Sequence, residues 1–297
     1  MTAPTIHIAG REVGPGQPIY LVCEGGINWQ GQVPIAVKLV HAAAESGADA
    51  IKWQKRTPAL HADPTKMRES CAFPEGELVT ELQHREALEF DHDGYATVSA
   101  EADAVGLDCF ASAWDVPSVD FLAEFEPPAW KIASASVTDL ELLEHTRDVA
   151  RRYGAAIIAS TGMSTLDQID AMVDVLGREQ LALLHCVSTY PMADDEANLA
   201  CIQTLRERYQ VPVGWSGHER GVPLSTWAVA RWRACIVERH LTLDRSMRGS
   251  DHAASLEPKG LAQLVRDIRI GEAADGHGRK EVSEKEQAQI ARLRRKL

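Results

Sequence analysis

The feature that most limits how this chain can fold is a regular alternation of short apolar runs and amphipathic segments. Eight runs have the length and composition of buried β-strands, and a segment with helical spacing of apolar residues separates each run from the next. Strands that are apolar throughout are typical of a parallel sheet covered by helices on both faces. The expected strands are 19–24, 49–53, 107–113, 130–133, 155–160, 181–187, 213–215 and 235–239.

Eight strand–helix units in 297 residues favour a closed (β/α)8 barrel, or TIM barrel. An open doubly wound sheet is the alternative built from the same elements. Two short strands within 1–18 would form a hairpin that caps the bottom of the barrel, and the charged segment 281–297 is expected to be helical. No linker, repeat or low-complexity segment divides the chain, so residues 1–297 are interpreted as one domain.

One stretch does not follow the alternation. The segment 58–76 contains three prolines and has no clear period, so we expect a long loop of the kind that often lines a binding site. Helical spacing resumes after this segment. The expected helices of the chain are 34–46, 77–89, 95–105, 116–125, 139–153, 165–176, 198–209, 224–233 and 258–273.

The composition excludes several classes of protein. A net charge of −12 opposes binding to nucleic acid, and it means that an anionic substrate needs a local cluster of cations. No apolar run approaches the roughly 20 residues of a membrane span, and the N-terminus lacks a signal peptide, so we expect a cytoplasmic protein. Six cysteines without Cys-x-x-Cys spacing indicate buried thiols rather than disulfides or a zinc site.

Polar side chains follow the expected strands at their carboxyl ends, where barrels of this kind carry their active sites. His218 and His240 end two neighbouring strands, and two neutral imidazoles placed there would bind one metal ion. Lys52 and Lys131 lie at other strand ends among several hydroxyl groups, which is a pattern suited to phosphate or carboxylate. Alternatively, each lysine pairs with a structural carboxylate such as Glu24.

A lysine in a barrel strand is also a candidate nucleophile that forms a Schiff base with a carbonyl substrate. The two histidines and a nearby glutamate favour a metal ion as the carbonyl activator instead. The sequence contains no glycine-rich nucleotide loop, no nucleophile elbow and no His-Glu-x-x-His motif.

Nine segments, in order along the chain, resemble the sialic acid (N-acetylneuraminate) synthases and the synthases of related nonulosonic acids. These are barrel enzymes that use phosphoenolpyruvate. The longest matches are Val237-Glu-Arg-His-Leu-Thr-Leu-Asp244 and Gly249-Ser-Asp-His-Ala-Ala-Ser-Leu-Glu-Pro258. The others are 23–31, 47–55, 88–90, 130–134, 160–164, 186–191 and 213–218.

The resemblance implies that phosphoenolpyruvate condenses with the aldehyde of an open-chain N-acylhexosamine, typically N-acetylmannosamine. Phosphate is released and a 2-keto-3-deoxy sugar acid forms. It further implies a divalent ion, most often Mn²⁺, with Mg²⁺ or Co²⁺ as alternatives, and His218 and His240 as its ligands. The implied phosphoenolpyruvate site is Lys52, Lys131, Ser134, Ser160, Ser188 and Ser216. The implied sugar site is Glu24, Gln54, Tyr190 and Asp251, of which Glu24 and Asp251 are the candidate catalytic residues.

Three features depart from the family pattern. Trp29 stands where a histidine is usual, and Gly25 replaces the isoleucine of a Glu-Ile-Gly motif. The sequence also ends where the barrel of the family ends, so the C-terminal antifreeze-like domain of many members is expected to be missing. Family analogy suggests a homodimer. A Schiff-base aldolase or lyase and a non-catalytic binding homologue are the alternative functions.

Overall fold

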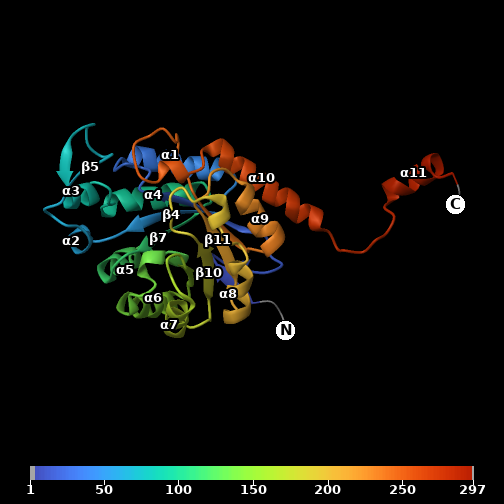
Figure 1. The fold of residues 1–297 in the computed structure, drawn as a ribbon, viewed down its shortest axis with the longest axis horizontal. Helices are drawn as coiled ribbons and strands as arrows, with labels where there is room; N and C mark the ends of the chain where they lie inside the picture. The colour runs from blue at the N-terminus through green and yellow to red at the C-terminus, as the bar shows by residue number, and fades with distance from the viewer. Residues whose placement is uncertain (1–3, 296–297) are drawn as a thin grey trace.

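A computed structural model describes residues 4–295, and its centre is a closed barrel of eight parallel strands (Figure 1). The strands pair in chain order, and the last pairs with the first, with His240 opposite Glu24. The predicted (β/α)8 barrel is therefore confirmed, and the open-sheet alternative is wrong. The barrel strands are β3 (Tyr20–Gly26), β4 (Ala50–Lys55), β7 (Asp108–Ala113), β8 (Ala129–Ile132), β9 (Ala156–Ser160), β10 (Leu181–Cys186), β11 (Val213–Gly217) and β12 (Ile236–His240).

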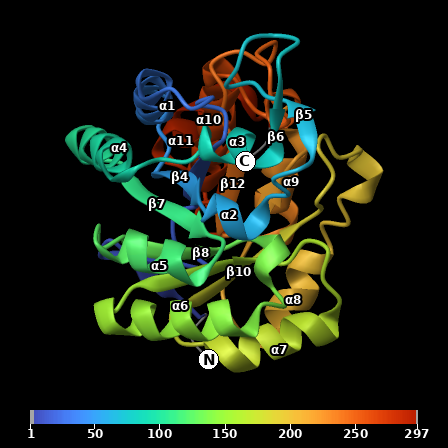
Figure 2. The ribbon, with the colours of Figure 1, turned by 90° about the vertical axis from the view of Figure 1, so that its left-hand side faces the viewer.

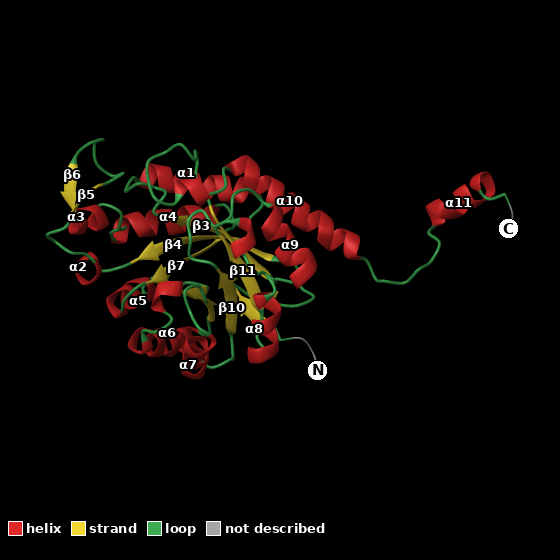
Figure 3. Cartoon of the chain, viewed as in Figure 1, coloured by secondary structure: helices red, strands yellow, loops and turns green. Residues whose placement is uncertain are grey.

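Helices surround the barrel (Figures 2 and 3). They bury one side against the strands, and local signals in the sequence set their ends. Asp115 caps one helix by accepting a hydrogen bond from the Ser118 amide, and Thr165 begins another with a capping box. Gly154 ends a third helix in the left-handed conformation. The ring consists of α1 (Val33–Glu45), α4 (His92–Ala104), α5 (Val116–Ala123), α6 (Leu140–Tyr153), α7 (Leu166–Leu176), α8 (Cys201–Tyr209), α9 (Pro223–Trp232) and α10 (Pro258–Asp275).

The amino-terminal hairpin closes the bottom of the barrel, as predicted. Strand β1 (Ile6–Ile8) pairs antiparallel with β2 (Arg11–Val13). Its buried side chains Ile6, Ile8 and Val13 join the apolar cluster that fills the barrel interior at the amino ends of the strands. A second, larger cluster lies between the strands and the helices and contains most of the remaining core.

The prediction for residues 58–89 is wrong in detail. The expected loop contains α2 (Pro58–His61) and β5 (Met67–Glu69), and β5 pairs with β6 (Leu78–Thr80). The expected helix 77–89 is only α3 (Glu81–Glu86), because Thr80 and Gln83 form a capping box that starts the helix after β6. The three residues of β5 are exposed, so no apolar period marks them. The segment lies at the carboxyl end of β4 (Figure 1).

The C-terminal segment forms α11 (Glu284–Leu293), a helix within the predicted 281–297, whose last two residues lie outside the described residues. Figure 1 shows α11 standing away from the barrel at the end of an extended connection that follows α10. All six cysteines are free thiols, and the four in barrel strands or next to them are buried. Within residues 4–295, no helix is both long and apolar enough to cross a membrane.

Candidate functional site

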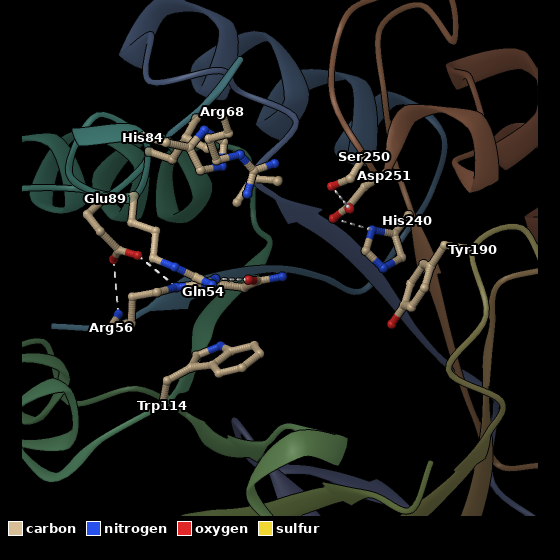
Figure 4. Close-up of a pocket in the computed structure, with 13 residues that line it drawn as sticks. Gln54, Arg56, Arg68, His84, Glu89, Trp114, Tyr190, His240, Ser250 and Asp251 are labelled. Atoms are coloured by element: carbon tan, nitrogen blue, oxygen red, sulfur yellow. Dashed lines mark hydrogen bonds and ion pairs between the residues drawn. The ribbon is translucent and has the colours of Figure 1, made fainter. Parts of the chain in front are cut away.

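Two neighbouring cavities open at the carboxyl ends of the strands. The first, of about 270 Å³, is lined by both site lysines, three of the site serines and His218. The second, of about 280 Å³, is lined by His240 and Asp251 together with residues of the 56–91 segment (Figure 4). Gln54, Trp114 and Tyr190 line both. The fold therefore brings the predicted site residues other than Glu24 and Ser134 together around two neighbouring spaces, with His218 in the first and His240 in the second.

Lys52 lies in the first cavity with two carboxylates. Its side chain is buried and contacts the carboxylate of Glu24, and its Nζ lies 3.8 Å from Oε1 of Glu238. It also donates a hydrogen bond of 3.1 Å to Ser112. Burial lowers the pKa of Lys52 to about 7, although the charge of Glu238 acts in the opposite direction. The alternative that a lysine pairs with a protein carboxylate thus holds for Lys52.

Lys131 is placed differently. It is buried, and its Nζ donates hydrogen bonds to Ser160 Oγ at 2.6 Å and to the Ile132 carbonyl at 3.0 Å. No carboxylate of residues 4–295 lies within 4.0 Å of this ammonium group. Burial favours the neutral acid of Glu238, but the charges of Lys131 and Lys52 hold the pKa of Glu238 below its ordinary value. Lys131 is therefore the cation that is available to an external anion.

Hydroxyl groups complete the wall of this cavity. Ser216 donates to Glu238 at 3.2 Å, while Ser134 accepts a hydrogen bond of 3.1 Å from the Gly162 amide. A Cβ atom at Gly162 would lie 2.4 Å from Ser188 Oγ and 2.8 Å from Ser134 Oγ. Only glycine at position 162 leaves both hydroxyls free to face a ligand.

His218 and His240 lie side by side, with ring centroids 5.5 Å apart. The Nδ1 of His218 is 2.6 Å from the Val187 carbonyl, so it donates its proton there and leaves the lone pair on Nε2. The Nδ1 of His240 is buried without a hydrogen-bond partner among the described residues, 3.7 Å from Asp251 Oδ2. Burial lowers the pKa of both rings, that of His218 to about 4.

These observations fit a metal site. Both imidazoles are held neutral, which is the form that binds metal ions, and one has its outer nitrogen fixed by a backbone carbonyl, as metal-binding histidines commonly have. Within residues 4–295, no group of three or more His, Cys, Asp or Glu side chains is arranged to hold an ion. Among the described residues, the two histidines are therefore not joined by a third side chain of these types in a metal-binding arrangement.

The second cavity holds the remaining predicted residues. The Tyr190 ring lies 4.0 Å from the His218 ring and 5.9 Å from the His240 ring, centroid to centroid. Asp251 accepts a hydrogen bond of 2.6 Å from Ser250, and the Gln54 amide contacts the Arg56 guanidinium. Polar groups that a hydroxylated ligand would meet thus line this space on several sides.

Sequence reasoning gave no binding role to several residues that line the two cavities. Glu238, two residues before His240 on the same face of β12, and Ser112 were expected at strand ends, but the family motifs assigned neither to a ligand. The segment 56–91 contributes most of the others, and nothing periodic in the sequence indicates where its side chains point. The residues missed there are Arg56, Arg68, His84, Arg85 and Glu89.

Two residues near the carboxyl ends of the strands belong to the scaffold instead. Trp29, which departs from the family pattern, is buried and stacks on Phe90 with ring centroids 3.9 Å apart. His185 bonds through Nε2 to the Ala197 carbonyl at 2.9 Å and packs near Trp215. Both side chains therefore stabilise the structure around the site.

A closed (β/α)8 barrel with buried lysines, hydroxyls and a histidine pair at the carboxyl ends of its strands defines, by fold and site, a barrel enzyme suited to anionic ligands. Comparison with known proteins gives the particular family. The chain belongs to the NeuB family, whose sequence pattern matches residues 39–280. The expected membership in the sialic and nonulosonic acid synthases is thereby confirmed.

Relatives match over most of their length. The chain is 34% identical to the N-acetylneuraminate-9-phosphate synthase of Mus musculus, over 92% of this chain and 76% of that protein. It is 32% identical to the N,N'-diacetyllegionaminic acid synthase of Legionella pneumophila, over 96% and 81%. The crystal structure of an N-acetylneuraminic acid synthetase from Leptospira borgpetersenii superposes with a TM-score of 0.83 and 31% identity, covering 99% of both chains.

Proposed function

We propose that this protein is a metal-dependent synthase that condenses phosphoenolpyruvate with the aldehyde of an open-chain N-acylhexosamine-like sugar. Phosphate leaves and a sialic acid-like 2-keto-3-deoxy sugar acid forms. The observation that carries the proposal is the pair of neighbouring cavities, one with two lysines and one polar, with His218 in the first and His240 in the second. The names of the relatives support this class of product.

Phosphoenolpyruvate would bind in the first cavity. Lys131 has no carboxylate partner there, so its ammonium group is available to the phosphate or the carboxylate of the ligand. Lys52 would share its charge between the ligand and Glu24. Ser134, Ser160, Ser188 and Ser216 would donate hydrogen bonds around the same anion.

His218 and His240 would hold a divalent ion, Mn²⁺ or alternatively Mg²⁺ or Co²⁺, with water and the aldehyde oxygen as further ligands. When bound, such an ion supplies Lewis-acid polarisation of the aldehyde carbonyl. The protein's own contribution is to keep both imidazoles neutral by burial and to fix the His218 ring through the Val187 carbonyl.

The sugar would lie in the second cavity against Gln54, Tyr190 and Asp251. Two buried carboxylate oxygens, Oε1 of Glu24 and Oε2 of Glu238, have no hydrogen-bond donor among the described residues. A sugar hydroxyl or a water molecule would satisfy each of them, since unpaired buried acceptors cost free energy. Glu238 lines the first cavity, so its free oxygen would accept from water or ligand beside the proposed phosphoenolpyruvate site.

The alkene carbon of phosphoenolpyruvate forms a bond to the aldehyde carbon, and the aldehyde oxygen takes up a proton. Water adds to the cationic carbon that bears the phosphate group and loses a proton. The carbon–oxygen bond to phosphate then breaks with its electron pair going to phosphate, while the new hydroxyl loses its proton and becomes the ketone oxygen. Glu24, which contacts Lys52, and Asp251, which lines the second cavity, would stabilise the cation and move these protons.

The direct test incubates the purified protein with phosphoenolpyruvate, Mn²⁺ and a panel of N-acylhexosamines and related aldoses. We expect phosphate release together with formation of a keto sugar acid, both abolished by a chelator and restored by Mn²⁺. The absence of any product from metal-loaded protein across the panel contradicts the proposal.

The pKa of Lys52 favours a second candidate. A lysine whose pKa is about 7 is partly unprotonated at neutral pH, as a Schiff-base nucleophile must be. Borohydride treatment in the presence of pyruvate or another keto acid separates the two mechanisms. A stable adduct of one keto acid on Lys52 supports the imine mechanism, whereas an unmodified protein that loses activity to chelator supports the metal-dependent one.

A further inference from the structure

A buried ion pair lies next to the two histidines, on the side away from the cavities. Glu219 follows His218 in the sequence, and Arg239 precedes His240. Neighbouring side chains of an extended chain point to opposite sides, so the histidines line the cavities while the ion pair lies among the outer elements. The Nη1 of Arg239 lies 2.7 Å from Oε1 of Glu219. Neither charged side chain lines either cavity of the site.

Both members of the pair are excluded from water. The side chain of Arg239 is 1% exposed and that of Glu219 is 0% exposed. The cost of taking two charges out of water is comparable to the free energy that their attraction returns, and apolar residues of similar volume often stabilise a core equally well. A contribution to net stability therefore does not explain why charged residues stand at these two positions.

Arg239 joins strand β12 to the segment that follows β11. Its Nη2 donates a hydrogen bond of 2.7 Å to the Glu219 carbonyl, and its Nη1 donates one of 2.7 Å to the Gly221 carbonyl. Ser225, in helix α9, donates a hydrogen bond of 2.6 Å to Glu219 Oε1 and accepts one of 3.1 Å from Arg239 Nη1. One guanidinium group therefore holds β12 against the segment that begins at His218.

A glycine makes room for the pair. Gly217 is the last residue of β11 and lies opposite Arg239 in the sheet. A Cβ atom at this position would lie 2.2 Å from Glu219 Oε2 and 3.0 Å from Arg239 Cδ. Any side chain at position 217 would displace the carboxylate, so the local sequence is suited to a charged pair packed closely against the strand.

The pair continues a connection that the sheet does not make. The ladder between β11 and β12 ends with Gly217 opposite Arg239, one residue before each histidine. Beyond that point the backbones of the two histidines are fixed to different partners, because the His218 carbonyl accepts from Met192 and the His240 carbonyl accepts from Leu256. The ion pair links the two chains directly at the level where the rings lie 5.5 Å apart.

We propose that the Arg239–Glu219 pair is a positioning device that sets the spacing of the His218 and His240 rings for a divalent ion. This inference rests on the metal site of the proposed function and assigns residues that act on it from outside. The pair acts through the two histidines, since it contacts neither cavity. Contacts that orient metal ligands typically change metal affinity about 10- to 100-fold when they are removed.

The affinity for Mn²⁺ tests the inference. The double variant Glu219→Gln and Arg239→Met removes the link between the strands and leaves no buried charge without a partner, so it should fold. We expect its Kd for Mn²⁺, measured by calorimetry without either substrate, to rise at least about tenfold. Arg269→Met is the matched control, because Arg269 also joins a backbone carbonyl, that of Ile19, to a carboxylate, that of Glu272. This control should lower Tm and leave the Kd unchanged.

A second variant decides the question if the double variant does not fold. Ser225→Ala removes the hydroxyl that bridges the two charged side chains, and it should raise the Kd for Mn²⁺ about threefold. A folded double variant that binds Mn²⁺ as tightly as the parent overturns the inference. In the absence of that variant, an unchanged Kd in Ser225→Ala does so, as does a parent protein that binds no Mn²⁺.

The binding measurement also separates this inference from the proposed reaction, because no substrate is present. An affinity for Mn²⁺ that depends on the pair, in a protein that turns over no aldose, leaves the inference standing while the proposed reaction fails. Turnover in the parent together with a Kd that is indifferent to the pair has the opposite meaning. The reaction then stands, and Arg239 and Glu219 belong to the scaffold alone.

Discussion

The two ends of the barrel interior are built from the same strands but have opposite chemistry. At the amino ends, inward-facing apolar side chains such as Val22, Phe110 and Ile158 pack under the hairpin. Two residues further along the same strands stand Glu24, Ser112 and Ser160. The two serines line the first cavity, and Glu24 contacts Lys52 there. Ala50 and Lys52, Ala129 and Lys131, and Ile236 and Glu238 follow the same rule.

The two-residue step explains this division. Side chains two apart on a strand point to the same side, so each of these six strands carries an apolar side chain and then a polar one into the interior. The apolar layer stabilises the closed sheet and the polar layer carries buried charge at a cost. Stability and activity are therefore separable in this barrel by position along a strand. Substitutions of ligand-binding groups in the polar layer should mainly lower activity, whereas substitutions in the apolar layer should mainly lower the free energy of unfolding.

The largest expected effect is on activity and comes from the histidine pair. In the double variant His218→Ala and His240→Ala, we expect kcat/KM to fall by about 10³-fold or more and Mn²⁺ binding to be lost, because both proposed metal ligands are removed. The barrel should stay folded, since neither ring belongs to the apolar layer. Calorimetric titration with Mn²⁺ and circular dichroism check the two statements. Full activity in the double variant would refute the proposed metal site.

The two lysines of the polar layer should differ in what their loss changes. Lys52→Met leaves two buried carboxylates, Glu24 and Glu238, without their nearest cation, and should lower the free energy of unfolding by about 3–5 kcal/mol. Lys131→Met removes a cation that has no carboxylate within 4.0 Å in the described chain. It should leave the free energy of unfolding nearly unchanged while raising KM for phosphoenolpyruvate about 100-fold. Urea unfolding and steady-state kinetics on both variants make the comparison, and equal losses of stability would contradict it.

The apolar layer should behave in the reverse manner. Phe110 is fully buried at the amino end of the barrel, and Phe110→Ala should lower the free energy of unfolding by about 3–5 kcal/mol through the cavity that it creates. Because Ser112 and its neighbours form a separate layer, kcat and both KM values should stay within about twofold of the parent at 20 °C. A large fall in kcat for a folded variant would show that the layers are coupled.

The sequence was sufficient for the barrel because eight buried strands have an unmistakable apolar pattern, and it located the polar layer because strand ends are easy to find. It was insufficient for residues 58–89. There the strands β5 and β6 are three residues long and largely exposed, so their side chains leave no period. Arg68 and Arg85 lie in this insertion, and only the folded chain brings them to the cavity of His240.

The smallest expected effect is a dependence of stability on pH, and it too separates the layers. Burial lowers the pKa of His218 to about 4, whereas an unfolded histidine has a pKa of about 6.5. Between these values the unfolded chain binds more protons than the folded chain. The free energy of unfolding of the metal-free protein should therefore fall as pH drops from about 6.5 to 4, by up to about 3 kcal/mol from this residue.

His218→Gln is the variant that tests this dependence, because it removes the titrating ring but keeps a polar side chain. The slope of unfolding free energy against pH between 4 and 6.5 should decrease by about 1 kcal/mol per pH unit relative to the parent. In the apolar layer, burial raises the pKa of Tyr20 and Cys235, so both stay neutral throughout this range and contribute no slope. Cys235→Ala is thus the matched control, expected to shift the whole curve without changing its slope. An unaltered slope in His218→Gln would mean that the His218 ring is protonated in the fold, and that this ring is not held ready as a neutral metal ligand.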